Sequence, residues 1–365
     1  MQAEVAAPPA RLGFKPRFAL YCVSASAVRY IEAAALGHRA SMHRTGKEET
    51  SPMRLVTFED EPKRDRLGAL ADGLVVDLNA AYRALLEERG ERRAGELALE
   101  AVPPEMVAFL DAGERALSAG REALELVARL GADGARERGL ARRAESVRLR
   151  APVPRPTKFI LVGLNYRDHA EEAGFKIPEV PTFFSKYANC VIGPGDAIKI
   201  PKVSTMIDYE GEYAFVIGRA GRDIPPDRAM EYVAGYTIVN DVSCRDYQMK
   251  TGQWMIGKTF DTFAPMGPYL VTRDEIADPH NLEISLYLNG QRMQHSNTRN
   301  LIFKTGEVIA FLSQVFTFEP GDVISTGTPA GVGYTRKPPV FMKPGDRVRI
   351  EVEGLGALEN PVEAA

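Results

Sequence analysis

Apolar and polar residues alternate along several short segments in the second half of the chain, a pattern typical of β-strands. Turn signals such as Asn289-Gly290 and Pro344-Gly345 separate these segments. We expect strands at residues 158–163, 208–217, 234–242, 282–288, 322–325 and 347–352. This spacing favours a mixed α/β, β-rich architecture over regular alternation of strands and helices.

The segment before residue 150 has a different pattern. Residues 53–58 and 67–78 are predicted to form two strands joined by a charged turn. Between residues 82 and 148, apolar residues recur at helical spacing. Breaks in this helical layer are predicted at Pro103-Pro104, Gly131 and Gly134. These elements together indicate a small N-terminal domain.

Three prolines in residues 151–156 predict a stiff, extended linker, because each proline fixes its own φ and disfavours helix at the preceding residue. We place a boundary there, between an N-terminal domain at 53–150 and a catalytic domain at 151–365. Residues 1–52 are rich in alanine and carry seven Lys and Arg against four Asp and Glu. We predict that they form a disordered extension or an upstream mis-start.

Composition excludes several classes of function. A net charge of −3 leaves no broad cationic surface, so nucleic acid is not an expected partner. No run reaches about 18 uninterrupted apolar residues, so no membrane span is expected. The three cysteines, Cys22, Cys190 and Cys244, are scattered without a C-x-x-C pair, which suits the reduced thiols of a cytoplasmic protein.

Acidic residues recur at every second position from Asp208, and strand geometry places Glu210 and Glu212 on one face. Parallel carboxylates repel unless a cation lies between them, and oxygen ligands suit a hard ion such as Mg²⁺ or Mn²⁺. Asp241, at the end of the next apolar strand, could complete the ligand set. The alternatives are a solvated acidic strand face for the glutamates and, for Asn240 and Asp241, capping of the following helix.

His169 and Glu172 are three residues apart in a predicted short helix, so both side chains lie on one face. The carboxylate can orient the imidazole for general-base work on a water molecule. The alternative is a surface ion pair. Glu171 is expected to point elsewhere.

Lys258 lies in a largely apolar segment, residues 253–267, where an ammonium group needs an anionic partner. It could face a substrate carboxylate or enolate, or extend to solvent as a surface lysine. The loop 325–333 is rich in glycine but lacks the phosphate-binding pattern of nucleotide sites. Thr328 of this loop could bind a carboxylate, and an ordinary surface turn is the alternative.

These segments, taken in this order, resemble the fumarylacetoacetate hydrolase superfamily, especially small bacterial members that act on acylpyruvates and diketo sugar acids. The resemblance covers about residues 157–360, and Met53 to Asp77 also looks like the family's N-terminal domain. It implies a fold of mixed sheets rolled around a metal site, usually in a homodimer. Tyr213 and Cys244 depart from the residues most common in similar sequences, without removing a predicted ligand.

The resemblance also implies roles for individual residues. Glu210, Glu212 and Asp241 fall on the metal ligands, and His169 with Glu172 falls on the water-activating dyad. Lys258 matches a catalytic position, and three further positions match contacts to the substrate carboxylate or the developing oxyanion, namely Arg245, Gln248 and Thr328.

The main functional hypothesis is therefore Mg²⁺- or Mn²⁺-dependent hydrolysis of a C–C bond in a 2,4-dioxo acid, giving a pyruvate-type product and a second acid. A second hypothesis keeps the metal and the enolate but makes the reaction an isomerisation or decarboxylation of a hydroxymuconate-type acid or oxaloacetate. A third is a non-catalytic binding protein. The small 2-oxo acid is the expected partner in the first two.

Overall fold

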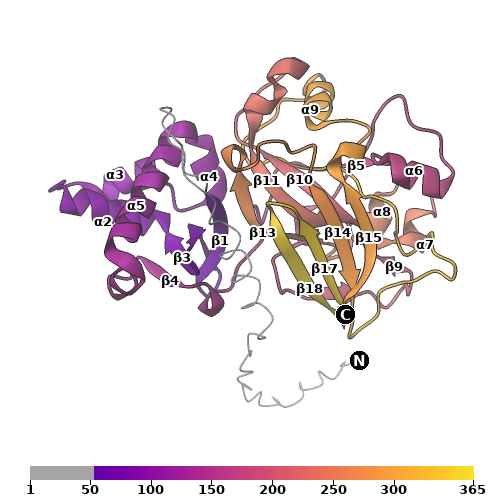
Figure 1. Cartoon of the computed structure of the whole chain (residues 1–365), viewed down its shortest axis with the longest axis horizontal. Coiled ribbons are helices and arrows are strands. Elements are labelled where there is room, and N and C mark those ends of the chain that lie inside the picture. Colours follow the sequence, from indigo (N-terminus) through magenta and orange to yellow (C-terminus); the bar gives the residue numbers. More distant parts are fainter. Residues whose placement is uncertain (1–52) are drawn as a thin grey trace, which may run out of the picture.

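The computed structural model describes residues 53–365, so the predictions for residues 1–52 and for Cys22 lie outside it. An eleven-stranded mixed sheet extends through most of the molecule, and a five-stranded sheet packs beside it (Figure 1). Most strand pairs are antiparallel, while β16 (Val323–Ser325) and β5 (Phe159–Gly163) run parallel. The predicted mixed, β-rich fold is confirmed.

The N-terminal part contains four strands and a layer of helices. The strands are β1 (Arg54–Glu61), β2 (Arg64–Ala71), β3 (Leu74–Asp77) and β4 (Ala141–Arg143). The helices are α2 (Leu78–Glu88), α3 (Ala94–Ala101), α4 (Met106–Asp111) and α5 (Gly113–Glu137). Gly131 interrupts α5 with φ 70° and ψ 171°, which confirms the break predicted there.

One strand prediction in this part was wrong. Residues 67–78 form a hairpin, because the chain turns at Asp72 and Gly73, whose φ angles are 47° and 75°. Asp-Gly is a strong signal for such a two-residue turn. Asp77 then ends β3 and caps α2, with its carboxylate accepting a hydrogen bond from the N–H of Ala80.

The C-terminal part holds the remaining elements. The strands of the large sheet here are β5, β6 (Thr182–Ser185), β7 (Val191–Ile192), β10 (Gly211–Ile217), β11 (Val233–Asn240), β13 (Ala264–Thr272) and β16. The five-stranded sheet contains β8 (Ile198–Ile200), β14 (Glu283–Leu288), β15 (Gln291–Asn297), β17 (Arg347–Val352) and β18 (Gly356–Ala364). β9 (Ile207–Asp208) pairs with β12 (Ser243–Cys244), and the helices are α6 (Arg167–Ala173), α7 (Arg245–Gln248), α8 (Met255–Lys258) and α9 (Thr305–Ser313).

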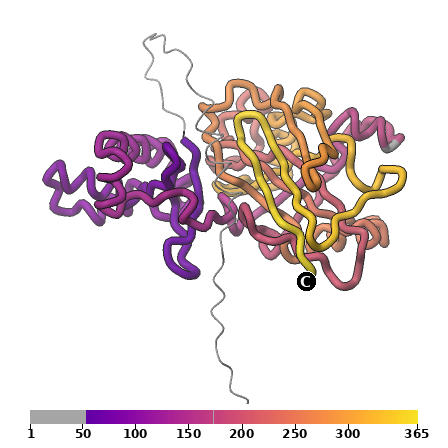
Figure 2. Tube along the Cα trace, turned by 60° about the horizontal axis from the view of Figure 1, so that its bottom comes forward, coloured from indigo at the N-terminus to yellow at the C-terminus, as the bar shows by residue number. Residues whose placement is uncertain are grey.

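A single sheet connects the two parts. Arg54 and Leu55 of β1 pair antiparallel with Val271 and Leu270 of β13. The N-terminal part lies to one side of the C-terminal part in both views (Figures 1 and 2). The domain boundary near residue 150 stays a prediction, and the linker is packed in place, since Ala151 and Val153 are buried.

β10 is buried along its whole length and has a hydrophobic core on each face. Tyr213, Phe215 and Ile217 join the core that includes the five-stranded sheet. Ala214 and Val216 join the core shared with the N-terminal helices. Such double burial explains why β10 is largely apolar, and it makes the carboxyl group of Glu212 conspicuous in this strand. None of the helices within residues 53–365 combines the length and apolar character needed to cross a bilayer.

Candidate active site

Three carboxylates meet where β10 and β11 lie side by side. Residues 209 and 210 fall between β9 and β10, so the strand predicted at 208–217 is interrupted. The N–H of Glu210 donates to the Asn240 side chain at 3.0 Å, and the N–H of Asp241 donates to the Glu210 carbonyl at 2.9 Å. These bonds bring Glu210, Glu212 and Asp241 together, with one oxygen from each within 4.8 Å of the others.

Both structural alternatives for these residues are excluded. Glu210, Glu212 and Asp241 are all buried, so they do not form a solvated strand face. Cys244 is the N-cap of α7 and makes no capping bond through its side chain. The oxygen of the Asn240 side chain is used by Glu210 instead.

Two of the carboxylates have basic partners. Glu210 contacts Lys258 Nζ at 2.9 Å and Arg245 Nη1 at 2.7 Å. Burial opposes its ionisation, but these two cations lower the pKa of Glu210 to about 2. Asp241 contacts Lys258 Nζ at 2.6 Å and Lys186 Nζ at 2.9 Å. Both side chains thus have cationic partners within a buried site.

Glu212 differs, because it makes no ion pair with a basic side chain within residues 53–365. It accepts hydrogen bonds from the Ser325 hydroxyl at 2.5 Å and the Gly327 N–H at 3.0 Å. Burial and the charges of Asp241 and Glu210 raise its pKa well above the usual value. A cation bound beside Glu212 would favour its ionised form.

The donor set fits a divalent metal ion. Three carboxylates offer only oxygen, which suits Mg²⁺ or Mn²⁺, and three protein ligands leave positions of an octahedral ion for substrate and water. The surrounding site also holds one more carboxyl group than basic side chains, so a bound cation would favour the ionised form of Glu212. Four carboxylates face three basic side chains there: Asp208, Glu210, Glu212 and Asp241 against Lys186, Arg245 and Lys258.

The three residues expected to bind a carboxylate lie around this cluster. Arg245 donates from Nη1 to the Gln248 side-chain oxygen at 3.0 Å and makes ion pairs with Asp208 and Glu210. Thr328 donates to the Gly211 carbonyl at 3.0 Å and accepts from Gln294 at 2.8 Å. Gln248 therefore lies against Arg245, which contacts Glu210, and Thr328 lies against Gly211, the residue between Glu210 and Glu212 in the chain.

His169 and Glu172 lie on α6, with Nδ1 3.5 Å from Oε2. Their side chains are 16% and 30% exposed, so the pair is neither deeply buried nor free in solvent. Burial opposes ionisation of Glu172, but His169 and the N–H of Gly331 lower its pKa. His169 also contributes to lowering the pKa of Glu210, so the dyad is electrostatically connected to the carboxylate cluster. Glu171 is exposed.

Two buried charged residues of this site were not predicted. Lys186 follows β6, and its ammonium donates to three backbone carbonyls, those of Val242, Lys258 and Phe263, at 3.0, 2.5 and 2.7 Å. Asp208 pairs with Arg245. Asp208 continues the i, i+2 spacing of Glu210 and Glu212, so that signal was present, whereas Lys186 had only its place at the end of an apolar segment.

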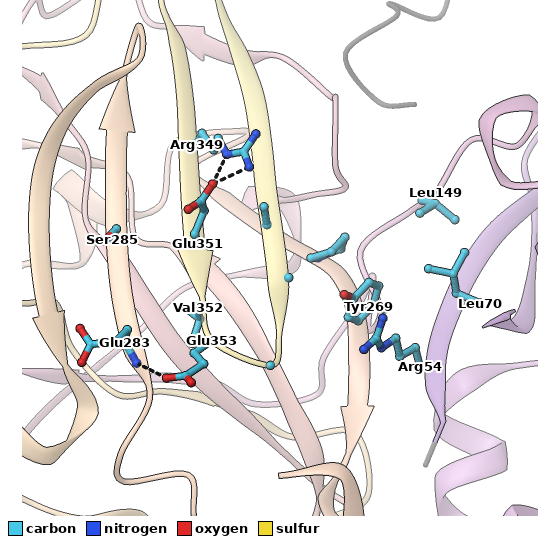
Figure 3. A pocket seen from close by; sticks show the side chains of 14 residues that line it. Arg54, Leu70, Leu149, Tyr269, Glu283, Ser285, Arg349, Glu351, Val352 and Glu353 are labelled. Carbon is cyan, nitrogen blue, oxygen red and sulfur yellow. Dashed lines mark hydrogen bonds and ion pairs between the residues drawn. The ribbon is translucent and has the colours of Figure 1, made fainter. Parts of the chain in front are cut away.

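A separate cavity of about 500 Å³ lies between the two parts of the chain (Figure 3). Arg54, Leu70 and Leu149 line it from the N-terminal side, and Tyr269 and residues of the five-stranded sheet line it from the other. Arg349 and Glu351 of its lining form an ion pair, whereas Arg54 pairs with Glu275, which lies outside the lining. None of the predicted site residues lines this cavity, so it is not the place where the chemistry is expected.

Comparison with known proteins identifies the family. Residues 158–363 match the family model described as fumarylacetoacetate (FAA) hydrolase C-terminal. The chain is 46% identical over 315 residues to oxaloacetate tautomerase Fahd2a, mitochondrial, of Rattus norvegicus, covering 85% of this chain and 91% of that protein.

Solved structures agree. A putative HpcE protein from Mycobacterium smegmatis superposes with a TM-score of 0.68 and 34% identity, covering 86% of this chain and all of that one. A 5-carboxymethyl-2-hydroxymuconate delta-isomerase from the same organism gives a TM-score of 0.56 and 45% identity, covering 62% of this chain and 85% of that one. The chain belongs to the fumarylacetoacetate hydrolase family.

Proposed function

We propose that this protein is a divalent-metal-dependent tautomerase that interconverts the keto and enol forms of a small 2-oxo acid such as oxaloacetate. The observation that carries the proposal is the buried cluster of Glu210, Glu212 and Asp241, with the ammonium of Lys258 against it. The similarity to an oxaloacetate tautomerase and to a hydroxymuconate isomerase supports this reaction class.

This choice differs from the hydrolysis expected first from the sequence. The relatives are named as a tautomerase and an isomerase, so the second sequence hypothesis fits better than C–C hydrolysis. Both reactions pass through an enolate of a 2-oxo acid, and the same residues can stabilise it. The predicted site residues therefore stay the same in this proposal, and only the reaction assigned to them changes.

Glu210, Glu212 and Asp241 would hold the metal, which we propose to be Mg²⁺ or Mn²⁺. Such an ion supplies Lewis-acid polarisation of the 2-oxo group, which makes the hydrogens on the adjacent carbon more acidic. The protein contributes the remaining steps through its own side chains.

In the keto-to-enol direction, the bond between C3 and its hydrogen breaks and an O–H bond forms at the 2-oxo oxygen. His169, oriented by Glu172, is the base that takes the C3 proton. Lys258 is the cation that donates a hydrogen bond to the developing enolate oxygen. His169 then gives this proton to the enolate oxygen, so the base is restored and no water is consumed. In the reverse direction, His169 takes the proton from the enol oxygen and returns it to C3.

Gln248, Arg245 and Thr328 would orient the substrate carboxylates. The side-chain oxygen of Gln248 accepts a hydrogen bond from Arg245. The amide NH₂ group of Gln248 therefore points away from Arg245, where it can donate to an anion.

We also propose a homodimer, as the resemblance implied. The cytoplasmic location expected from the sequence remains a prediction, and the name of the rat relative places that protein in mitochondria.

The test is an assay of the full chain with Mg²⁺ or Mn²⁺ on oxaloacetate. Enol absorbance measures tautomerisation, and a coupled enzyme measures released pyruvate. We expect faster loss of the enol than with the same metal ion alone, without pyruvate. Pyruvate formed in step with oxaloacetate loss would make the protein a decarboxylase, and cleavage of an acylpyruvate without any tautomerase activity would restore the hydrolase hypothesis.

A further inference from the structure

Asp208 is a buried carboxylate that lies beside the proposed metal site without belonging to its ligand cluster. We propose that it is a positioning residue, which fixes Arg245 against the metal carboxylate Glu210 and so sets the affinity of the site for its cation. This inference rests on the proposed metal site, and it extends that proposal to a residue with no assigned role.

Asp208 has all its acceptor capacity occupied by protein donors. Its Oδ2 atom contacts Arg245 Nε at 2.9 Å and Nη2 at 2.7 Å, and it accepts from the N–H of Tyr334 at 2.9 Å. Its Oδ1 atom accepts from the N–H groups of Tyr209 and Gly333, both at 2.8 Å. The side chain is fully buried, so it cannot turn to another partner. It therefore serves to hold its neighbours.

The neighbour that matters most is Arg245. Two of its nitrogens, Nε and Nη2, are fixed on Asp208, and a guanidinium is planar, so the direction of Nη1 is fixed as well. Nη1 lies 2.7 Å from Oε1 of Glu210. The other Glu210 oxygen contacts Lys258 at 2.9 Å, so the carboxylate is held at both ends. Asp208 thus determines where a predicted metal ligand presents its lone pairs.

The same side chain anchors a loop that reaches the dyad. Gly333 and Tyr334 donate their backbone N–H groups to Asp208, and two residues earlier the N–H of Gly331 donates to Glu172 at 3.0 Å. A Cβ at Gly333 would come within 2.6 Å of Asp208 Oδ1 and 1.8 Å of the Val340 carbonyl, so only glycine fits there. Asp208 is therefore a common support for the dyad and for the metal carboxylates.

The charge of Asp208 also offsets that of Arg245. Without it, a guanidinium with no second carboxylate would face Glu210 and compete with a divalent cation for the same oxygens. Residues that hydrogen-bond to metal ligands, as Arg245 does to Glu210, typically change metal affinity about 10- to 100-fold when they are replaced, and Asp208 acts through Arg245. We expect a loss in this range from Asp208→Asn, which keeps the size of the side chain.

The experiment measures the Kd of the full chain for Mn²⁺ alone by isothermal titration calorimetry. Asp208→Asn should raise the Kd at least about tenfold. Asp246→Asn is the matched control, because Asp246 is next to Arg245 in sequence but contacts Ser204, Cys244 and Tyr247 instead. That variant should stay within about twofold of the wild type. Thermal unfolding shows whether each variant is folded.

Two further variants separate positioning from a general loss of structure. In an Arg245→Met background there is no guanidinium to position, so adding Asp208→Asn should change the Kd by less than about twofold. Arg245→Lys keeps the charge but loses the planar fork, and it should weaken Mn²⁺ binding even if Asp208→Asn does not fold.

The inference is overturned if Asp208→Asn binds Mn²⁺ like the wild type, or if it loses as much affinity in the Arg245→Met background. Failure of the proposed function gives a different result, because a wild-type chain that binds Mn²⁺ but does not tautomerise oxaloacetate leaves the role of Asp208 intact. A wild-type chain that binds no Mn²⁺ at all would remove both.

Discussion

Lys258 and Asp241 form a buried ion pair, with Nζ of the lysine 2.6 Å from Oδ2 of the aspartate. Burial alone would lower the pKa of the lysine, but Asp241 and Glu210 raise it above its usual value. Lys258 is therefore a cation, which donates hydrogen bonds and does not act as a base. This assignment agrees with our proposal that His169 takes up the proton from carbon.

Replacing Lys258 with methionine should leave two buried carboxylates without their ammonium partner. We expect the metal-free protein to lose about 3–5 kcal/mol of unfolding free energy, and Mn²⁺ to restore most of it by taking over the missing positive charge. Denaturant unfolding with EDTA and with Mn²⁺ measures both effects. Lys250→Met is the control, because Lys250 is exposed and lies over the Tyr247 ring. Equal losses in both variants would contradict this role.

A substitution of glutamate by glutamine should affect stability differently at two neighbouring positions, Glu210 and Glu212. Glu210→Gln breaks contacts with Lys258 and Arg245, so it should destabilise the metal-free protein by about 3–5 kcal/mol at neutral pH. Glu212→Gln should leave that stability nearly unchanged, because the raised pKa of Glu212 favours a neutral carboxyl that resembles an amide. Both variants should lose Mn²⁺ binding. A comparable loss of stability at both positions would argue against the charge arrangement described above.

Replacing His169 with alanine removes the proposed base. The rate of tautomerisation should fall about 10²- to 10⁴-fold, the usual contribution of a positioned acid or base. The Kd for Mn²⁺ should hardly change, since His169 is not in the carboxylate cluster. The matched control is Glu171→Gln, an exposed neighbour on the same helix. If the His169 variant keeps full activity, the proton is taken up by another group.

His280 should make stability depend on pH. Burial and the charge of Lys304 lower the pKa of His280 from 6.5, and its Nε2 atom accepts the N–H of Thr305 at 3.2 Å. The folded state thus favours the neutral ring, while the unfolded state binds a proton below pH 6.5. The contribution of His280 to the free energy of unfolding is complete above that pH. It falls as the pH drops from 6.5 towards the pKa of His280 in the folded state.

His280→Gln should flatten that decline, because an amide oxygen can accept the same N–H and does not titrate. Urea unfolding between pH 5 and pH 7 measures the slope, with the exposed His295→Gln as control. If the slope is unchanged in the His280 variant and reduced in the His295 variant, His295 causes the decline and the prediction is wrong.

The sequence predicted local features well because they depend on neighbouring residues. Strand β17 has the bounds expected from its alternating pattern, and the break at Gly131 lies where the glycine indicated. The hairpin at Asp72-Gly73 was missed because the apolar residues on both sides of the turn read as one continuous strand. The pairing of Arg54 with Val271 joins distant segments, and no local pattern specifies such a partner.

The site was predictable to the extent that its residues form short motifs. The spacing of Glu210 and Glu212 indicated a shared direction, and the structure brings Asp241 to them. Lys186 was missed because the carbonyls that hold it come from three separate places in the chain. Asp208 lies two residues before Glu210, so its spacing was visible in the sequence. Its hydrogen bonds, however, come from a loop more than 120 residues later, at Gly333 and Tyr334.

The central claim is that Glu210, Glu212 and Asp241 share one divalent cation. Anomalous diffraction from a crystal grown with Mn²⁺ tests it directly. The account predicts one strong anomalous peak that marks a single Mn²⁺ ion, with an oxygen of each of the three side chains at roughly 2.0–2.3 Å from the ion. A crystal with Mn²⁺ at other sites only, or with the peak bonded to one of these carboxylates and not the others, would contradict it.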